Sequence, residues 1–180
     1  MKKAILLLAI TASLTSCKAQ KKPIMTSETT VVKTNDILLG KHAKEALLNI
    51  PYSLWYKPNH ENYKPNTTTI TELKKYTEGV SVTLFMGTWC EDSQQQVPAF
   101  YKILEHLQFN NDAVTLIAMD KNKTTSEQFE KDLNITNVPT FIFHKNGKEL
   151  YRIVERPMET LEKDMLKIVT GQPYKHAYEN

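Results

Sequence analysis

The segment around Cys90 constrains the fold of this chain more than any other part of its 180 residues. Residues 80–86 (VSVTLFM) are rich in β-branched and aromatic side chains, which predicts a buried strand. A short turn follows, and Cys90 then stands beside Trp89 at the start of a predicted helix that runs toward Phe109. Pro98 lies inside this helix and is expected to kink it. The sequence thus places one cysteine where a strand gives way to a helix.

The remaining C-terminal half alternates between strand and helix patterns. We expect strands over 113–119, 140–144 and 149–154, and helices over 126–133 (with Ser126 as N-cap) and 157–169. The pair Asn146-Gly147 predicts a hairpin turn between the last two strands. The first two strands should be parallel because a helix joins them, whereas the hairpin strands should be antiparallel. The predicted class is α/β, with a mixed central β-sheet and helices on both faces.

The region before this pattern is more ambiguous. Residues 36–48 have helical spacing that ends before Pro51, and residues 70–76 predict a short helix. Between them lies an aromatic stretch interrupted by prolines. Packing of an irregular cap on the domain explains this stretch, and the alternative is a platform beside a binding groove. The aromatic residues of the stretch are Tyr52, Trp55, Tyr56 and Tyr63.

Several short motifs together resemble the thioredoxin family. They are Trp89-Cys90-x-x-Ser93, Pro98, Val138-Pro139-Thr140 and Lys145-Asn146-Gly147. Their order and spacing carry the resemblance, which covers roughly residues 69–169. It implies a thioredoxin-like fold preceded by an N-terminal helical extension. It also implies that Pro139 is cis, that the backbone of Val138 faces Cys90 and pairs with a substrate strand, and that Trp89 lines the substrate groove.

Three positions depart from the dithiol members of that family. Ser93 replaces the second, resolving cysteine. Leu84 stands where those proteins carry a buried acid used in proton transfer, and this acid would have no resolving thiol to act on here. Glu155 stands where thioredoxin has a glycine that lines its docking surface. The chain therefore looks most like the lipid-anchored, monothiol (Cys-x-x-Ser) thioredoxin-like proteins of the Bacteroidetes type.

A single thiol limits the chemistry that such a site supports. A Cys90 thiolate at a helix N-terminus could attack a disulfide to form a mixed disulfide, with Ser93 donating its hydroxyl to the sulfur. Release then needs an external thiol. The expected partners are protein or low-molecular-weight thiols and disulfides, with no cofactor and no metal. Two alternatives are a non-catalytic binding module and a degenerate scaffold that holds an inert cysteine.

The N-terminus predicts export and lipidation. Lys2 and Lys3 precede an apolar run over residues 4–12 that is too short to span a bilayer. The following Leu14-Thr15-Ser16-Cys17 resembles the lipobox of bacterial lipoproteins, which implies cleavage before Cys17 and acylation of that residue. A plain secretory signal is the alternative. Lys18 is not an acidic retention signal, so we expect an outer-membrane anchor that faces the periplasm.

These observations divide the chain into a signal peptide over 1–16, a flexible tether over 17–36, the helical and aromatic extension over 37–68, the thioredoxin-like domain over 69–172 and a tail over 173–180. The formal net charge of +3 falls to +1 once Lys2 and Lys3 are removed. A nearly neutral chain is a poor partner for nucleic acid. We expect a monomer attached to the membrane through the lipid on Cys17.

Overall fold

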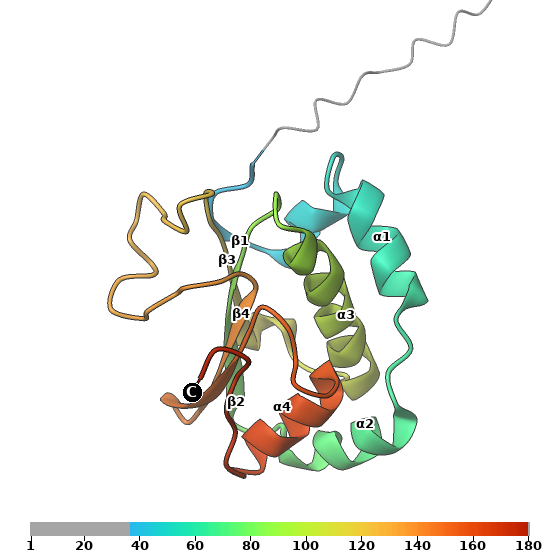
Figure 1. Cartoon of the computed structure of the whole chain (residues 1–180). Coiled ribbons are helices and arrows are strands. Elements are labelled where there is room, and N and C mark those ends of the chain that lie inside the picture. Colours follow the sequence, from blue (N-terminus) through green and yellow to red (C-terminus); the bar gives the residue numbers. More distant parts are fainter. Residues whose placement is uncertain (1–36, 180) are drawn as a thin grey trace, which may run out of the picture. The chain divides into compact units, whose positions relative to one another are not determined.

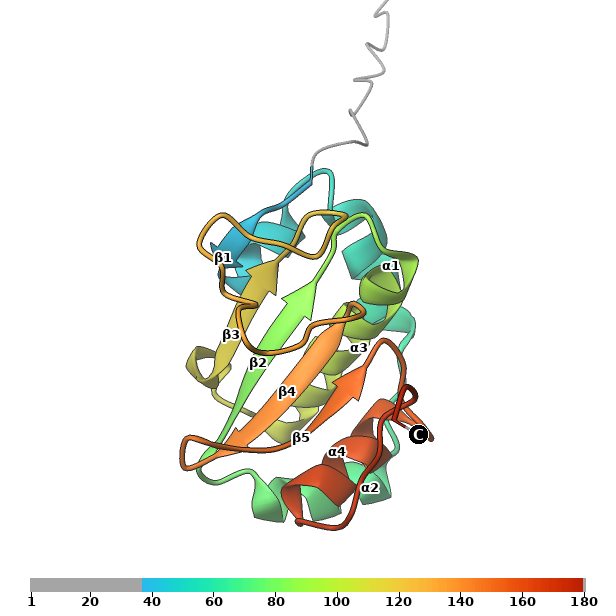
Figure 2. The same ribbon diagram turned by 60° about the vertical axis from the view of Figure 1, so that its left-hand side comes forward.

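A computed structural model describes residues 37–179, in which five strands form one mixed sheet. The strand order is β1-β3-β2-β4-β5 (Figure 2). The strands are β1 (Gly40–His42), β2 (Val80–Met86), β3 (Val114–Ala118), β4 (Thr140–Lys145) and β5 (Lys148–Val154). β2 pairs with β3 in parallel and with β4 antiparallel, and β4 and β5 form an antiparallel hairpin. The predicted α/β class and thioredoxin-like mixed sheet are confirmed.

The α-helices gather against one face of this sheet (Figure 1). They are α1 (Ser53–Asn62), α2 (Thr67–Leu73), α3 (Glu91–Leu107) and α4 (Leu161–Val169), with short 3₁₀ turns η1 (Lys44–Leu48), η2 (Lys74–Tyr76) and η3 (Asn111–Ala113). The main core lies between helices and sheet. At its centre the rings of Phe100 on α3 and Phe141 on β4 lie 4.9 Å apart, and both residues are fully buried. Pro98 lies within α3, which continues through it as one helix.

The other face of the sheet is covered by the segment 119–139, where the predicted helix over 126–133 is absent. This prediction was wrong because successive turns replace the helix: Gln128, Asp132 and Asn134 have positive φ angles, which interrupt a right-handed helix. Thr125 rather than Ser126 caps the segment, because its hydroxyl oxygen accepts a hydrogen bond from the Phe129 N–H at 2.9 Å. Apolar side chains of this segment still pack on the sheet, namely Phe129, Leu133 and Ile135.

The N-terminal extension also differs in detail from its prediction. The helical spacing over 36–48 was misleading, since the structure has the strand β1 and the turn η1 there. Gly40 has a φ of 84°, outside the helical region, and β1 pairs antiparallel with β3 at the edge of the sheet. The aromatic stretch forms the regular helix α1 rather than an irregular cap. The helix predicted over 70–76 is present as α2 and η2.

A buried carboxylate fastens this extension to α4. The Tyr63 hydroxyl donates to Glu162 Oε2 at 2.6 Å, and the Asn66 backbone N–H donates to Glu162 Oε1 at 3.0 Å. Burial alone would raise the pKa of Glu162, but these hydrogen bonds outweigh it and hold the pKa below its ordinary value of 4.5. The carboxylate therefore stabilises the fold in its charged form. Among residues 37–179, no helix has the length and apolar character that crossing a bilayer requires.

Replacing Phe141 by alanine should destabilise the domain by about 3–5 kcal/mol, because removing a fully buried ring that packs against Phe100 would leave a cavity. Urea or thermal unfolding measures the loss. Lys148→Ala, at the exposed start of β5, is the control and should change the free energy of unfolding by less than about 0.5 kcal/mol. Equal effects of the two variants would contradict this account of the core.

Glu162→Gln should lower the free energy of unfolding at neutral pH by about 1–3 kcal/mol, because one buried donor then faces an amide N–H₂. The pKa of Glu162 is lower in the folded chain than its ordinary value, so this stabilisation is present above pH 4.5 and is lost as the pH falls through the folded pKa. The difference between native chain and variant should therefore shrink in acid. A difference that grows on acidification would refute the assignment, and the exposed Glu78→Gln is the matched control.

Candidate functional site

Cys90 lies at the N-terminus of α3, directly after the central strand β2. It is the N-cap residue, with an extended backbone (φ −94°, ψ 125°). Its N–H donates to the Gly87 carbonyl at 3.0 Å, and its carbonyl accepts the N–H of Gln94 at 3.0 Å. The thiol is thus fixed where the unpaired N–H groups of the first helical turn favour negative charge. The side chain is half-buried.

The thiol faces the loop before β4, as the resemblance implied. Cys90 Sγ donates a hydrogen bond to the Val138 carbonyl oxygen at 3.2 Å. The Val138–Pro139 peptide bond is cis. Within residues 37–179 the Val138 N–H has no hydrogen-bond partner, although the Val138 side chain is buried. The structure therefore brings Cys90, Val138 and Pro139 together and leaves one backbone donor beside the thiol unused.

Trp89 forms a wall of the site and is held from two sides. Its indole N–H donates to the Met119 carbonyl at 2.9 Å. Its ring lies so close to Gly87 that a Cβ at position 87 would come within 2.5 Å of it. Gly87 is therefore required for close approach rather than for an unusual φ. The half-buried ring packs at the edge of the smaller apolar cluster, next to the thiol.

Ser93 is placed differently from what the sequence suggested. It is fully buried, and its Oγ accepts a hydrogen bond from the Gly87 N–H at 3.2 Å. Within the described part of the chain, no hydrogen bond joins Ser93 to Cys90. Ser93 thus closes the turn between β2 and α3, and its contribution to the chemistry of the thiol stays a prediction. Leu84 is fully buried among apolar side chains, and a carboxyl group at this position would have no polar side chains of that cluster beside it.

Two contacts from the N-terminal extension reach the site, and sequence patterns gave no signal for them. The Leu38 N–H donates to the Thr88 hydroxyl oxygen at 3.2 Å, beside Trp89. The Asn59 side-chain amide on α1 donates to the Gln94 carbonyl at 3.0 Å. Gln94 in turn donates to the Thr88 carbonyl at 2.8 Å. The extension therefore supports the turn that carries the thiol, beyond packing on the outside of the domain.

Glu155 borders the site on the far side of Pro139. Its N–H donates to the Pro139 carbonyl at 2.7 Å. Its carboxylate accepts hydrogen bonds from the Asn137 side-chain amide at 3.1 Å and from the Tyr178 hydroxyl. Glu155 was singled out from the sequence as a departure, but nothing in the sequence indicated that Tyr178 of the C-terminal tail would reach it. Residues 37–179 hold no group of three His, Cys, Asp or Glu placed to bind a metal.

A half-buried cysteine at the start of the helix after a central strand, facing the cis-proline loop before the neighbouring strand of a mixed sheet, defines a thioredoxin-like protein. The family model for thioredoxin matches residues 55–167. The chain belongs to the thioredoxin family. Solved structures agree on the fold: a protein of unknown function from Pseudomonas aeruginosa is 14% identical, covers 73% of this chain and 93% of its own, and superposes with a TM-score of 0.56. An HIV epitope-scaffold is 16% identical, covers 74% of this chain and 94% of its own, and superposes with a TM-score of 0.52.

Two plant proteins are similar in sequence. Thioredoxin H2 of Arabidopsis thaliana is 30% identical over 84 residues, which is 47% of this chain and 59% of the relative. The chloroplastic Thioredoxin Y of Oryza sativa subsp. japonica is 32% identical over 89 residues, which is 49% of this chain and 50% of the relative. The chain thus spans little more than half the length of these curated relatives.

Gly87→Ala should displace the Trp89 ring, because the new methyl group would lie 2.5 Å from it. We expect a loss of about 1–3 kcal/mol in the free energy of unfolding. The indole should also leave the Met119 carbonyl, which fluorescence can report. The measurement is made in a Trp55→Phe chain, in which Trp89 is the sole tryptophan. This chain with Gly87 unchanged is the control. An unchanged emission spectrum together with unchanged stability would mean that the ring is not fixed by this contact.

Proposed function

We propose that this protein is a monothiol thiol-disulfide exchange protein that acts through Cys90. The observation that carries the proposal is the half-buried Cys90 thiol, 3.2 Å from the Val138 carbonyl and beside Pro139. Membership of the thioredoxin family and the two thioredoxin relatives support thiol-disulfide chemistry in general. The monothiol character rests on the sequence, because the only other cysteine, Cys17, lies outside the described residues.

The reaction begins with loss of the Cys90 S–H proton to solvent, which gives the nucleophilic thiolate. The thiolate attacks one sulfur of a substrate disulfide. A new S–S bond forms to Cys90, the substrate S–S bond breaks, and the departing sulfur leaves as a thiolate that takes a proton from water. One disulfide is exchanged for another, so no outside oxidant or reductant is consumed in this step.

The backbone of Val138 provides a place for an extended substrate. Its N–H has no partner within residues 37–179, and its carbonyl is occupied only by the Cys90 thiol, whose proton is lost when the thiolate forms. An extended peptide substrate can therefore hydrogen-bond to both the N–H and the carbonyl of Val138. This pairing would align the substrate disulfide with Cys90. Trp89 would line the same groove. These are the substrate-binding roles proposed for Val138, Pro139 and Trp89.

Release needs a thiol from outside the chain. The mixed disulfide is broken when an external thiolate, from a protein or a small molecule, attacks the substrate sulfur and Cys90 leaves as a thiolate. Ser93 cannot form this bond, and it is buried against the Gly87 N–H. The proposed protein therefore shuffles disulfides or removes single mixed disulfides, and does not reduce or oxidise a dithiol pair by itself.

We place this activity in the bacterial envelope. The support is the lipobox-like string that ends in Cys17, with Lys2 and Lys3 before an apolar run. Acylation of Cys17 would anchor the protein in a membrane, since each buried CH₂ of an acyl chain adds about 0.8 kcal/mol. The proposed location is the outer membrane on its periplasmic side, with the protein as a monomer.

The test uses the full chain with Cys17→Ser, so that Cys90 is the only thiol. With hydroxyethyl disulfide, the native site should form one stable adduct, visible by mass spectrometry, which an added thiol releases. Adding Ser93→Cys should place a second thiol one helical turn away, within the usual separation of about 4.4–6.8 Å between bridged Cα atoms. This variant should release the adduct without added thiol and become oxidised itself.

Cys90→Ser, in the same background, is the control and should form no adduct. A native chain that forms the adduct only after unfolding in urea would overturn the exchange proposal and favour an inert scaffold. A native chain that forms the adduct while Ser93→Cys fails to release it would favour a binding module that holds its partner covalently.

A further inference from the structure

Glu155 lies next to the cis-proline loop with which the proposed substrate strand would pair. It follows β5 directly, and β4 lies between β5 and β2, the strand that precedes Cys90. Its N–H donates to Pro139 at 2.7 Å, so its backbone lies in register with the cis-proline loop. Neighbouring strands are about 4.8 Å apart, which puts Glu155 about two strand spacings, or roughly 10 Å, from the thiol. That distance is within reach of a residue next to a bound disulfide.

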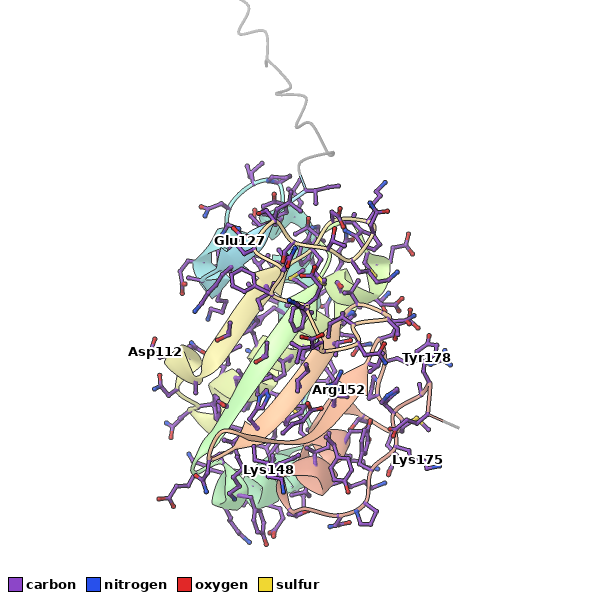
Figure 3. The ribbon with its side chains drawn as sticks, turned by 90° about the vertical axis from the view of Figure 1, so that its left-hand side faces the viewer. Asp112, Glu127, Lys148, Arg152, Lys175 and Tyr178 are labelled. Atoms are coloured by element: carbon purple, nitrogen blue, oxygen red, sulfur yellow. The ribbon has the colours of Figure 1, made fainter. Side chains whose placement is uncertain are left out.

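The Glu155 side chain is held by neutral donors. The Asn137 amide binds Oε1 at 3.1 Å, and the Tyr178 hydroxyl binds Oε2. Figure 3 shows Tyr178 on the C-terminal segment, which runs beside β5. A hollow of about 610 Å³ opens at this point, and its lining includes three neighbours of Glu155, namely Asn137, Val154 and Tyr178. The carboxylate is thus oriented by two neutral hydrogen-bond donors, Asn137 and Tyr178, and both of these residues line the hollow.

No cation within residues 37–179 forms an ion pair with Glu155. Arg152 lines the same hollow, but its guanidinium already donates to the Glu149 carboxylate at 2.8 and 2.9 Å and to the Leu133 carbonyl at 2.6 Å. Arg156 follows Glu155 in the chain, and within residues 37–179 it makes no ion pair either. Within the described residues, the Glu155 carboxylate beside Pro139 is therefore free of any ion pair.

We propose that Glu155 is a specificity-determining residue, whose carboxylate selects disulfide substrates that carry a positive charge beside the reacting sulfur. Asn137 and Tyr178 are its positioning residues. The proposal rests on the exchange function proposed for Cys90 and names the substrate class of that site: disulfides flanked by lysine, arginine or an amine, in preference to anionic low-molecular-weight disulfides. Glu91 and Asp92, which begin α3 beside the thiol, have the same sign of charge.

The test compares three small symmetric disulfides that differ in charge: cystamine (positive), hydroxyethyl disulfide (neutral) and dithiodipropionate (negative). Adduct formation on the full chain with Cys17→Ser is timed by mass spectrometry, and each rate is divided by the rate of the same disulfide with 2-mercaptoethanol. At low salt we expect cystamine to exceed dithiodipropionate by about tenfold. Glu155→Gln should reduce this ratio by about threefold, and 0.5 M NaCl should reduce it as well, because salt screens charges at this distance.

Glu78→Gln is the matched control, since it removes the same charge from an exposed residue that precedes β2, at the end of that strand away from Cys90. It should leave the ratio unchanged. If hydroxyethyl disulfide reacts but the ratio is near one, or falls equally in both variants, the charge selection by Glu155 is overturned and the exchange function stands. If none of the three disulfides reacts with native Cys90, the exchange function is overturned and the selection falls with it.

Discussion

The register between β2 and β4 is the constraint on which the site depends. Phe85 pairs with Thr140, so the residues that follow β2 and those that precede β4 meet at the same end of the sheet. A shift of one residue would turn every side chain of β4 to the opposite face, and the buried Phe141 would leave the main core. The hydrogen bond from Cys90 to Val138 is therefore maintained by core packing well below it. The position of the Cys90 thiol relative to Val138 is therefore fixed by the packing of Phe141 against Phe100 in the core.

Segments from both ends of the described chain converge on this site. Leu38 and Asn59 support the turn and first helical residues around Cys90, while Tyr178 reaches the carboxylate beside Pro139. Residues 38 and 178 lie outside the part that matches the family model, which covers 55–167. The family portion thus provides four of the five strands, the thiol and the proline loop, and the flanking segments contribute β1 and contacts around the site.

Sequence patterns foretold the parts of the fold that depend on local chemistry. The strands β2, β3, β4 and β5 were visible as β-branched and aromatic runs, and α3 as a helix after Cys90. The structure of residues 126–133 was not predictable in this way, because their apolar residues have helical spacing. Hydrogen bonds of Thr125 with Phe129 and Glu130 instead hold this segment in successive turns. The motifs that carry the site were recognisable, but the burial of Ser93 against Gly87 and the reach of Tyr178 depend on contacts that no local pattern encodes.

The short strand β1 has a consequence for the behaviour of the chain in concentrated or crowded surroundings. It pairs with Leu116, Ile117 and Ala118, which are among the most apolar residues of β3. Without β1, these residues would form an open edge with unpaired backbone groups, ready to accept a strand from another molecule. With only three residues, among them Lys41 and His42, β1 closes that edge and offers a poor template in its place. The extension that supports the thiol thereby also guards the sheet against edge-to-edge aggregation.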